Sequence, residues 1–130
     1  DQKFLQNEAR KFLEKEESIK RSREILDQSS SLDTDLWQKI VALGWTGIRI
    51  PENFDGLGLG HLELCVIAEE LGRFLAPVPF SSSVYLFTEA VIKYGSEELK
   101  KDILPKLVSG EIVGTLAVTE DFMAPSSSTL

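Results

Sequence analysis

Three glycines at alternate positions, Gly56, Gly58 and Gly60, are the first residues whose spacing could do chemistry, because glycine-rich loops before a helix can cradle a phosphate. A dinucleotide loop needs Gly-x-Gly-x-x-Gly directly after a strand, whereas here the third glycine comes one residue early, with His61 in its place. No Gly-Lys-Ser/Thr follows, which excludes a P-loop. We therefore expect a tight structural connection, in which the glycines supply positive φ and let helices approach closely.

The single cysteine, Cys65, and the single histidine, His61, are the next candidates for chemistry. Four residues apart, they would only be neighbours on one helix face, and together they cannot build a structural zinc site. Cys65 lies in the apolar run 64–68, so we expect a buried thiol that acts as a small hydrophobic side chain. The sequence predicts no disulfide, no metal site and no catalytic cysteine.

The composition excludes several classes of function. The chain has 130 residues, 21 acidic and 14 basic, with a net charge of −7, and it lacks the basic stripe of a nucleic-acid-binding protein. Lys20, Arg21 and Arg23 lie among acids and indicate a solvated helix face. No apolar run is long enough to span a membrane, and the charged N-terminus does not resemble a signal peptide. We expect a cytoplasmic protein, with an organelle still open because the first residue is not Met.

The first half of the chain is predicted to hold two helices and an extended segment. Apolar residues recur at helical spacing over residues 2–27, which predicts one long amphipathic helix. Asp33 or Thr34 then begins a second helix that ends at Gly44. Residues 45–51 are expected to be extended.

The second half is predicted to hold three more helices. The helix that starts near His61 is apolar almost all round, so we place it at the centre of the core. A helix over 82–94 should bury one side, and another should begin at the Ser96 cap and end near Gly110. The buried side of the helix over 82–94 comprises Val84, Phe87, Val91 and Tyr94.

The pattern changes at Ile112, where the β-branched, apolar residues 112–119 predict a strand. A lone strand leaves its backbone groups unpaired, so this one requires a sheet that the chain does not contain. We therefore predict an all-α domain of about five helices over 1–111, followed over 112–130 by the first strand of a missing β-domain and an irregular tail.

The order of these elements resembles that of one enzyme family. The blocks "LWQKIVALGWTGIRIPENFDGLGLGHLELCVIAEELGRFLAPVPF" and "YGSEELKKDILPKLVSGEIVGTLAVTE" cover nearly the whole chain. Together they resemble the N-terminal helical domain of acyl-CoA dehydrogenases, which carry Leu-Gly-x-x-Gly-Ile-x-x-Pro-Glu, Gly-Leu-Gly and Glu-Glu-Leu-Gly in this order. The later Gly-Ser-Glu-Glu and Leu-Pro-x-Leu-x-x-Gly-Glu patterns resemble the same family.

The resemblance implies an FAD-dependent α,β-dehydrogenation of an acyl-CoA, in which a carboxylate takes the α proton and the flavin takes the β hydride. In such enzymes the base and most of the flavin site lie in later domains, so the resemblance implies no catalytic residue here and no activity for this chain alone. The acids of this chain are then solvated or structural, namely Glu52, Glu69, Glu70, Glu97 and Glu98.

The resemblance also implies a few binding residues. Leu116, Val118 and Thr119 match flavin-side positions of the strand that enters the β-domain, although packing in a sheet would explain them equally well. Ser82 and Leu86 match positions that border the acyl cavity, with helix capping and core packing as alternatives. Asp121 replaces the proline of the family's Thr-Glu-Pro, which leaves flavin contacts beyond Thr119 open.

Two functions follow as hypotheses. The first is the N-terminal domain of an acyl-CoA dehydrogenase that walls the acyl cavity and shields the flavin. Its expected partners are acyl-CoA, other subunits of a homo- or hetero-oligomer, and an acceptor such as electron-transfer flavoprotein; in a eukaryote its location would be the mitochondrial matrix. The alternative is a non-catalytic helical partner subunit or binding module.

Overall fold

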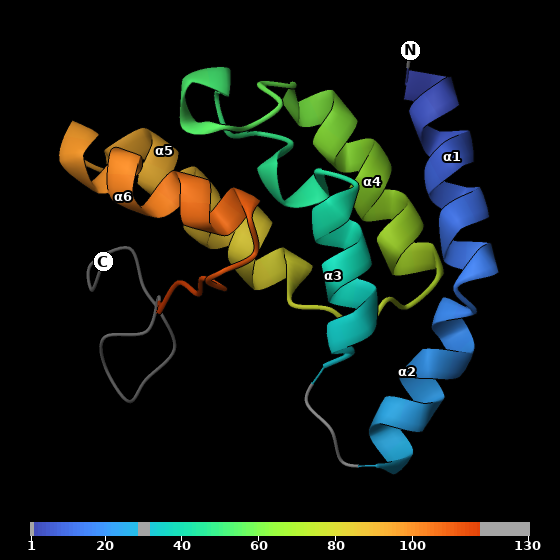
Figure 1. Ribbon diagram of the computed structural model, residues 1–130. Helices are drawn as coiled ribbons and strands as arrows, with labels where there is room; N and C mark the ends of the chain where they lie inside the picture. Colours follow the sequence, from blue (N-terminus) through green and yellow to red (C-terminus); the bar gives the residue numbers. More distant parts are fainter. Residues whose placement is uncertain (1, 29–31, 118–130) are drawn as a thin grey trace, which may run out of the picture.

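The computed structural model describes residues 2–28 and 32–117, and within these ranges the chain is helical without any strand (Figure 1). The predicted all-α fold is therefore confirmed, whereas residues 112–117 of the strand predicted over 112–119 are not in a strand, since none of the described residues pairs with them as a second strand. The α-helices are α1 (Gln2–Lys15), α2 (Ser18–Asp27), α3 (Thr34–Ala42), α4 (His61–Arg73), α5 (Glu89–Tyr94) and α6 (Glu97–Val108). The π-helix η3 (Ser81–Thr88) runs directly into α5, and the short 3-10 turns η1 (Trp45–Gly47) and η2 (Glu52–Phe54) lie between α3 and α4.

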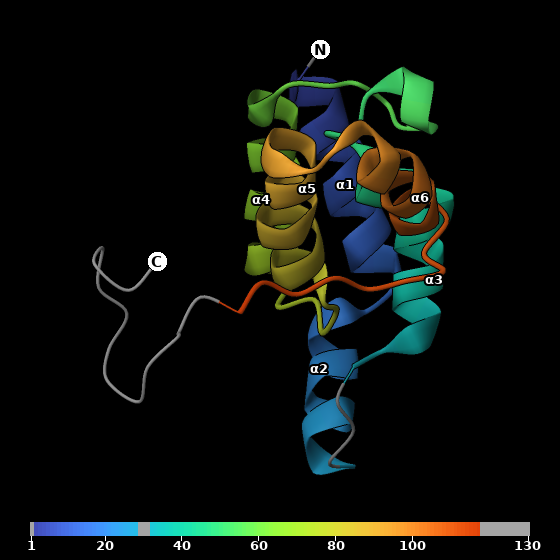
Figure 2. The same cartoon turned by 90° about the vertical axis from the view of Figure 1, so that its left-hand side faces the viewer.

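The single long helix predicted over 2–27 is wrong, because the chain breaks between α1 and α2. Glu17 has a left-handed backbone with φ of 51°, a conformation that costs a non-glycine residue roughly 1 kcal/mol. The break redirects α2, which extends below the rest of the domain in Figure 2. The sequence pattern missed it because both helices keep an apolar stripe.

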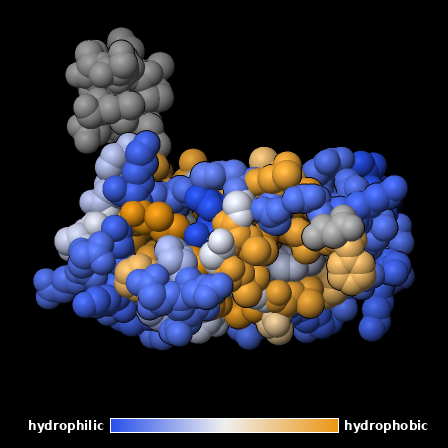
Figure 3. Space-filling view, turned by 90° about the horizontal axis from the view of Figure 1, so that it is seen from above, coloured by the Kyte–Doolittle hydropathy of each residue, from blue (hydrophilic) through white to orange (hydrophobic). Residues whose placement is uncertain are grey.

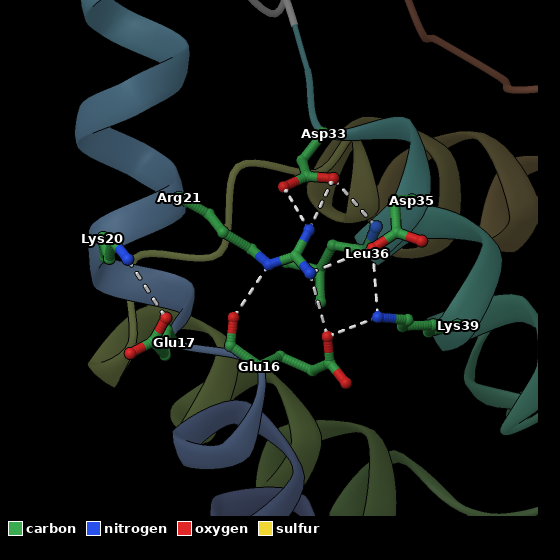
Figure 4. Close-up of polar contacts among 8 residues, drawn as sticks. All are labelled: Glu16, Glu17, Lys20, Arg21, Asp33, Asp35, Leu36 and Lys39. Carbon is green, nitrogen blue, oxygen red and sulfur yellow. Dashed lines mark hydrogen bonds and ion pairs between the residues drawn. The ribbon is translucent and has the colours of Figure 1, made fainter.

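An ion-pair network around Arg21 fixes this break (Figure 4). The Arg21 Nε donates to the Glu16 carbonyl at 2.8 Å, and its guanidinium lies 3.0–3.1 Å from the carboxylates of Glu16, Asp33 and Asp35. Lys39 adds contacts of 2.6 Å to Glu16 and 3.0 Å to Asp35. The network therefore ties the start of α2 to α3.

Helix α3 follows the prediction, whereas the segment after it does not. The Asp33 side chain accepts from the Leu36 N–H at 2.9 Å, and the helix ends before Gly44. The extended segment predicted over 45–51 instead begins with the 3-10 turn η1. Thr46 in this turn is buried and donates to the Val108 carbonyl at 2.9 Å, so packing against α6 overrides the local β-propensity.

Helix α4 packs along α1 and buries one face rather than its whole circumference. Leu64, Ile67 and Leu71 are buried, together with the charged Glu70. Cys65 is exposed, so the predicted buried thiol is wrong. The apolar composition of residues 64–68 did not reveal this, because an apolar residue is buried only where another element packs against its face of the helix.

The helix predicted over 82–94 is present, but its first half is the π-helix η3. Val84 and Val91 are buried as predicted, whereas Tyr94 is 78% exposed. Tyr94 is the last residue of α5, and Lys93 Nζ lies over its ring at 5.3 Å from the centroid. The Ser96 cap of α6 is confirmed, since its hydroxyl accepts from the Leu99 N–H at 3.2 Å.

The core consists of two clusters of buried apolar residues. The larger joins α1, α3, α4 and η3 through Ala9, Leu13, Leu36, Trp37, Ile40, Trp45, Ile48, Leu64, Ile67, Leu71, Phe80 and Val84. The smaller lies under α5 and α6 and comprises Ile50, Phe54, Val91, Leu104 and Leu107. These clusters hold α4 and the η3–α5 helix in fixed positions.

Candidate functional site

A groove of about 510 Å³ lies between α4 and the η3–α5 helix, and it is the candidate functional site. One more wall comes from residues 112–117, which leave α6 and run back across the domain (Figure 2). We call residues 112–117 the exit segment. The groove is lined by His61, Leu64, Tyr85, Leu86, Glu89, Ala90, Lys93, Tyr94 and Leu116.

The groove brings together two of the residues that the sequence singled out. Leu86 and Leu116 come from distant segments, are 46% and 41% exposed, and line the same space. Ser82 does not line it, because its half-buried hydroxyl donates to the Pro79 carbonyl at 3.2 Å. Val118 and Thr119 lie outside the described residues. The binding roles of all five residues stay predictions.

The exit segment is held on the π-helix by Gly114. The Gly114 N–H donates to the Ser83 hydroxyl at 3.2 Å, and the Thr88 hydroxyl donates to the Ser83 carbonyl at 2.7 Å. A Cβ at position 114 would overlap the ring of Phe87, so this close approach requires glycine. These contacts fix the direction in which Leu116 meets the groove.

The other end of the groove is polar. The Arg49 Nε donates to Glu89 Oε1 at 2.7 Å, and His61 Nε2 lies 3.5 Å from Glu89 Oε2. Arg49 Nη1 also donates to the Leu59 carbonyl at 2.7 Å. Sequence reasoning missed this cluster, since its members come from three separate segments and no local pattern links Arg49 to Glu89.

Tyr85 supplies a neutral polar group to the groove wall. Burial raises the pKa of its phenol to about 12, with the nearby Cys65 adding to the effect, so the hydroxyl stays protonated at neutral pH. Its ring packs edge-on against Phe80 at 5.4 Å between centroids. The phenol therefore offers a hydrogen bond without adding charge.

The glycine-rich loop does not form a phosphate cradle. The backbone N–H groups of residues 57–59 donate to carbonyls within residues 47–50 at 2.8–2.9 Å, which leaves these donors occupied. A Cβ at Gly56 would overlap the Ile50 carbonyl, and Gly58 has φ of 61°. The predicted structural role is confirmed for Gly56 and Gly58, although Gly56 approaches a turn rather than a helix, and Gly60 has φ of −82° rather than a positive value.

A larger cavity of about 560 Å³ lies beside the Arg21 network, where mainly charged and polar side chains line it. In the view from above, apolar side chains gather across the middle of the molecule between hydrophilic edges (Figure 3). Among the described residues, no group of three His, Cys, Asp or Glu side chains could hold a metal ion. In the same part of the chain, no helix is long and apolar enough to cross a membrane.

Comparisons with known proteins match this fold and its sequence. A family model described as "Acyl-CoA dehydrogenase, N-terminal domain" matches residues 1–111. The mitochondrial isovaleryl-CoA dehydrogenase of Solanum tuberosum is 36% identical over 109 residues, which are 81% of this chain and 26% of that protein.

Solved structures agree with the sequence comparison. A chain of the "Tcur3481-Tcur3483 steroid ACAD G363A variant" superposes with a TM-score of 0.81 at 34% identity, covering 94% of this chain and 33% of that one. A chain of the ChsE4-ChsE5 complex from Mycobacterium tuberculosis gives 0.82 at 28% identity, covering 93% and 33%. This chain spans a third or less of the length of these relatives. It belongs to the acyl-CoA dehydrogenase family and corresponds to the N-terminal helical domain of its members.

Proposed function

We propose that this chain is the N-terminal domain of an FAD-dependent enzyme that removes hydrogen across the α,β bond of an acyl-CoA thioester. The groove between α4 and the η3–α5 helix would form one wall of the acyl cavity. The observation that carries this proposal is the meeting of Leu86 and Leu116 in that groove. One is the expected substrate-side residue and the other the expected flavin-side residue, and they come from different segments of the chain.

The side chains of the groove suit an acyl chain. Leu64, Leu86 and Ala90 supply apolar surface, and burial of each methylene against such surface is worth about 0.8 kcal/mol. The neutral phenol of Tyr85 adds a hydrogen-bonding group without a charge. A wall of this kind binds the chain, orients it and excludes water from the reaction.

The residues at the Leu116 end of the groove fit a flavin, although the complete site requires residues outside this chain. The exposed side chain of Leu116 gives an apolar surface against which a planar ring system can pack. Thr119 would donate a hydroxyl to the ring edge, and Val118 would continue the apolar contact. When bound, FAD supplies the acceptor for the substrate hydride.

Larger assembly is part of the proposal. One solved relative is named as a complex of two proteins and another by a pair of names, so we propose association with identical or related subunits. Electrons would leave through an acceptor such as electron-transfer flavoprotein. The location would be the cytoplasm, or the mitochondrial matrix in a eukaryote.

The test is direct oxidation of acyl-CoA by the full-length gene product. The purified protein should contain FAD, lose its oxidised flavin absorbance on anaerobic addition of acyl-CoA, and release the enoyl-CoA detected by mass spectrometry. Residues 1–130 alone with added FAD should form no product. A full-length protein without flavin and without enoyl-CoA formation would contradict the proposal.

A further inference from the structure

We propose that Ser83 is a positioning residue for the flavin, because its buried hydroxyl holds the exit segment where Leu116 can contact the ring system. This inference rests on the proposed function above. Ser83 lies on η3, the same helix whose residue Leu86 lines the groove, so one side chain joins the acyl wall to the flavin-side segment. Ser83 acts through the exit segment rather than by contact with the flavin.

Residues 113–117 of the exit segment are attached to the helical domain at one point. Gly114 is the only buried residue among them. Its N–H donates to the Ser83 hydroxyl at 3.2 Å, and this is the only hydrogen bond that residues 113–117 form with the described part of the chain. The position of Leu116, two residues further along, therefore depends on the contact between Gly114 and η3.

The Ser83 hydroxyl belongs to a buried part of the π-helix. Ser83 is 3% exposed and Thr88 is 1% exposed. The Thr88 hydroxyl donates to the Ser83 carbonyl at 2.7 Å, and the two residues are five apart, which is the spacing of a π-helical turn. Such turns occur frequently at functional sites. The exit segment therefore meets an acceptor that the helix itself holds in place.

Loss of this acceptor would release the exit segment. In Ser83→Ala the Gly114 N–H would be buried without a partner, and a buried amide of this kind is less stable than one bonded to water. The response of lowest energy is a movement of the segment away from η3, since residues 115–117 are already exposed. Leu116 would move with it, and the proposed flavin-side surface would lose its position.

Thr88 offers a matched control within the same turn. Its hydroxyl is as buried as that of Ser83, but it bonds the Ser83 carbonyl and not the exit segment. Thr88→Val removes this hydroxyl and leaves the bond from Gly114 to Ser83 in place. A general loosening of η3 would affect both variants, whereas a positioning role affects Ser83→Ala alone.

The test measures the binding of FAD to the full-length apoprotein by the quenching of flavin fluorescence. Ser83→Ala should raise the Kd for FAD about fivefold, which is the effect of losing one hydrogen bond of ordinary strength. It should also change the visible circular dichroism of the bound flavin, whereas Thr88→Val should change neither. Ser83→Cys keeps the size of the side chain with a weaker acceptor, so it should raise the Kd too and serves if Ser83→Ala does not fold.

Amide hydrogen exchange in the flavin-free protein gives a second readout that does not depend on activity. Exchange in residues 112–117 should be faster in Ser83→Ala than in the wild type and unchanged in Thr88→Val. Exchange in α1, which lies away from this contact, should be the same in all three proteins.

The outcomes separate this inference from the proposed function. A wild-type protein that binds no FAD contradicts the proposed function, and with it the role of Ser83 toward the flavin. A wild type that binds FAD, with a folded Ser83→Ala variant whose Kd and flavin spectrum are unchanged, contradicts the role of Ser83 alone. An equal rise of the Kd in Ser83→Ala and Thr88→Val would also overturn it, because both would then act through the general packing of η3.

Discussion

Two arginine–glutamate pairs join distant segments of this domain, and they differ in what surrounds the carboxylate. Arg10 of α1 donates to both oxygens of Glu70 at 3.0 and 2.7 Å, and the Glu70 side chain is fully buried. Arg49 donates to one oxygen of Glu89 at 2.7 Å, and Glu89 is 27% exposed beside an apolar groove.

The difference separates a structural pair from one that can act on a ligand. The carboxylate of Glu70 is saturated, since Arg73 lies 3.5 Å away as a further partner, so the pair only holds α1 against α4. Glu89 keeps part of its surface free in the lining of a cavity. The same two residue types therefore stabilise the packing in one region and line the candidate groove in the other.

The largest effect is expected at the buried pair. Glu70→Ala should lower the free energy of unfolding by about 3 kcal/mol, because it leaves a cavity in the core and removes the partner of Arg10. The neighbouring exposed Glu69 is the matched control, and Glu69→Ala should cost no more than about 0.5 kcal/mol. Urea unfolding of both variants measures the difference, and equal losses would contradict the structural role of Glu70.

A second strong effect is expected where the exit segment meets the groove helix. Gly114→Ala places a Cβ against the Phe87 ring, and relief of the overlap should cost about 2 kcal/mol. Amide hydrogen exchange should speed up in residues 112–117 and not in α1. Adding Phe87→Ala should restore slow exchange in this segment, and failure to do so would show that the close approach is not what holds it.

Acid should weaken the structural pairs in a graded way. Hydrogen bonds from Arg10 lower the pKa of Glu70 below its ordinary value of 4.5, and those from Lys39 and then Arg21 lower the pKa of Asp35 below 3.8. Since these folded-state pKa values are depressed, the stabilisation is complete above the ordinary values. It is lost as the pH falls through the lowered ones.

Urea unfolding at about pH 7 and about pH 3.5 measures how the free energy of unfolding depends on pH. We expect a lower free energy of unfolding in acid. The loss of unfolding free energy between the two pH values should be smaller in Glu70→Gln, because this variant no longer carries the Glu70 carboxylate. Equal falls in this variant and in the wild type would contradict the contribution of Glu70.

The smallest effect on stability is expected at the groove. Glu89→Gln removes a charge from a partly exposed pair and should cost about 1 kcal/mol or less in the free energy of unfolding. Thermal unfolding of Glu89→Gln and Glu70→Gln compares the loss of stability at the two pairs. A loss at Glu89 as large as that at Glu70 would make both pairs structural.

The sequence was sufficient to predict those elements whose signals are local. Asp33 and Ser96 cap helices as expected, because a capping side chain bonds a backbone group only three residues away. The helix that starts at His61 was also predicted, since its length and apolar residues mark it.

Features that depend on distant contacts could not be predicted. Glu17 adopts a left-handed backbone that its residue type disfavours, and contacts of Arg21 with Glu16 and Asp33 hold the break in place. The π-helix carries no local signal, and its fit with Gly114 is made across the fold. Leu86 and Leu116 were singled out from the sequence and line the groove, whereas the contact of Arg49 with Glu89 required the three-dimensional structure.

A crystal structure of the full-length protein with a non-reactive thioether analogue of acyl-CoA tests the central claim most directly. The account predicts that the acyl chain lies within about 4.5 Å of Leu64, Leu86 and Leu116. An acyl chain bound elsewhere, with this groove filled by another part of the polypeptide, would contradict it.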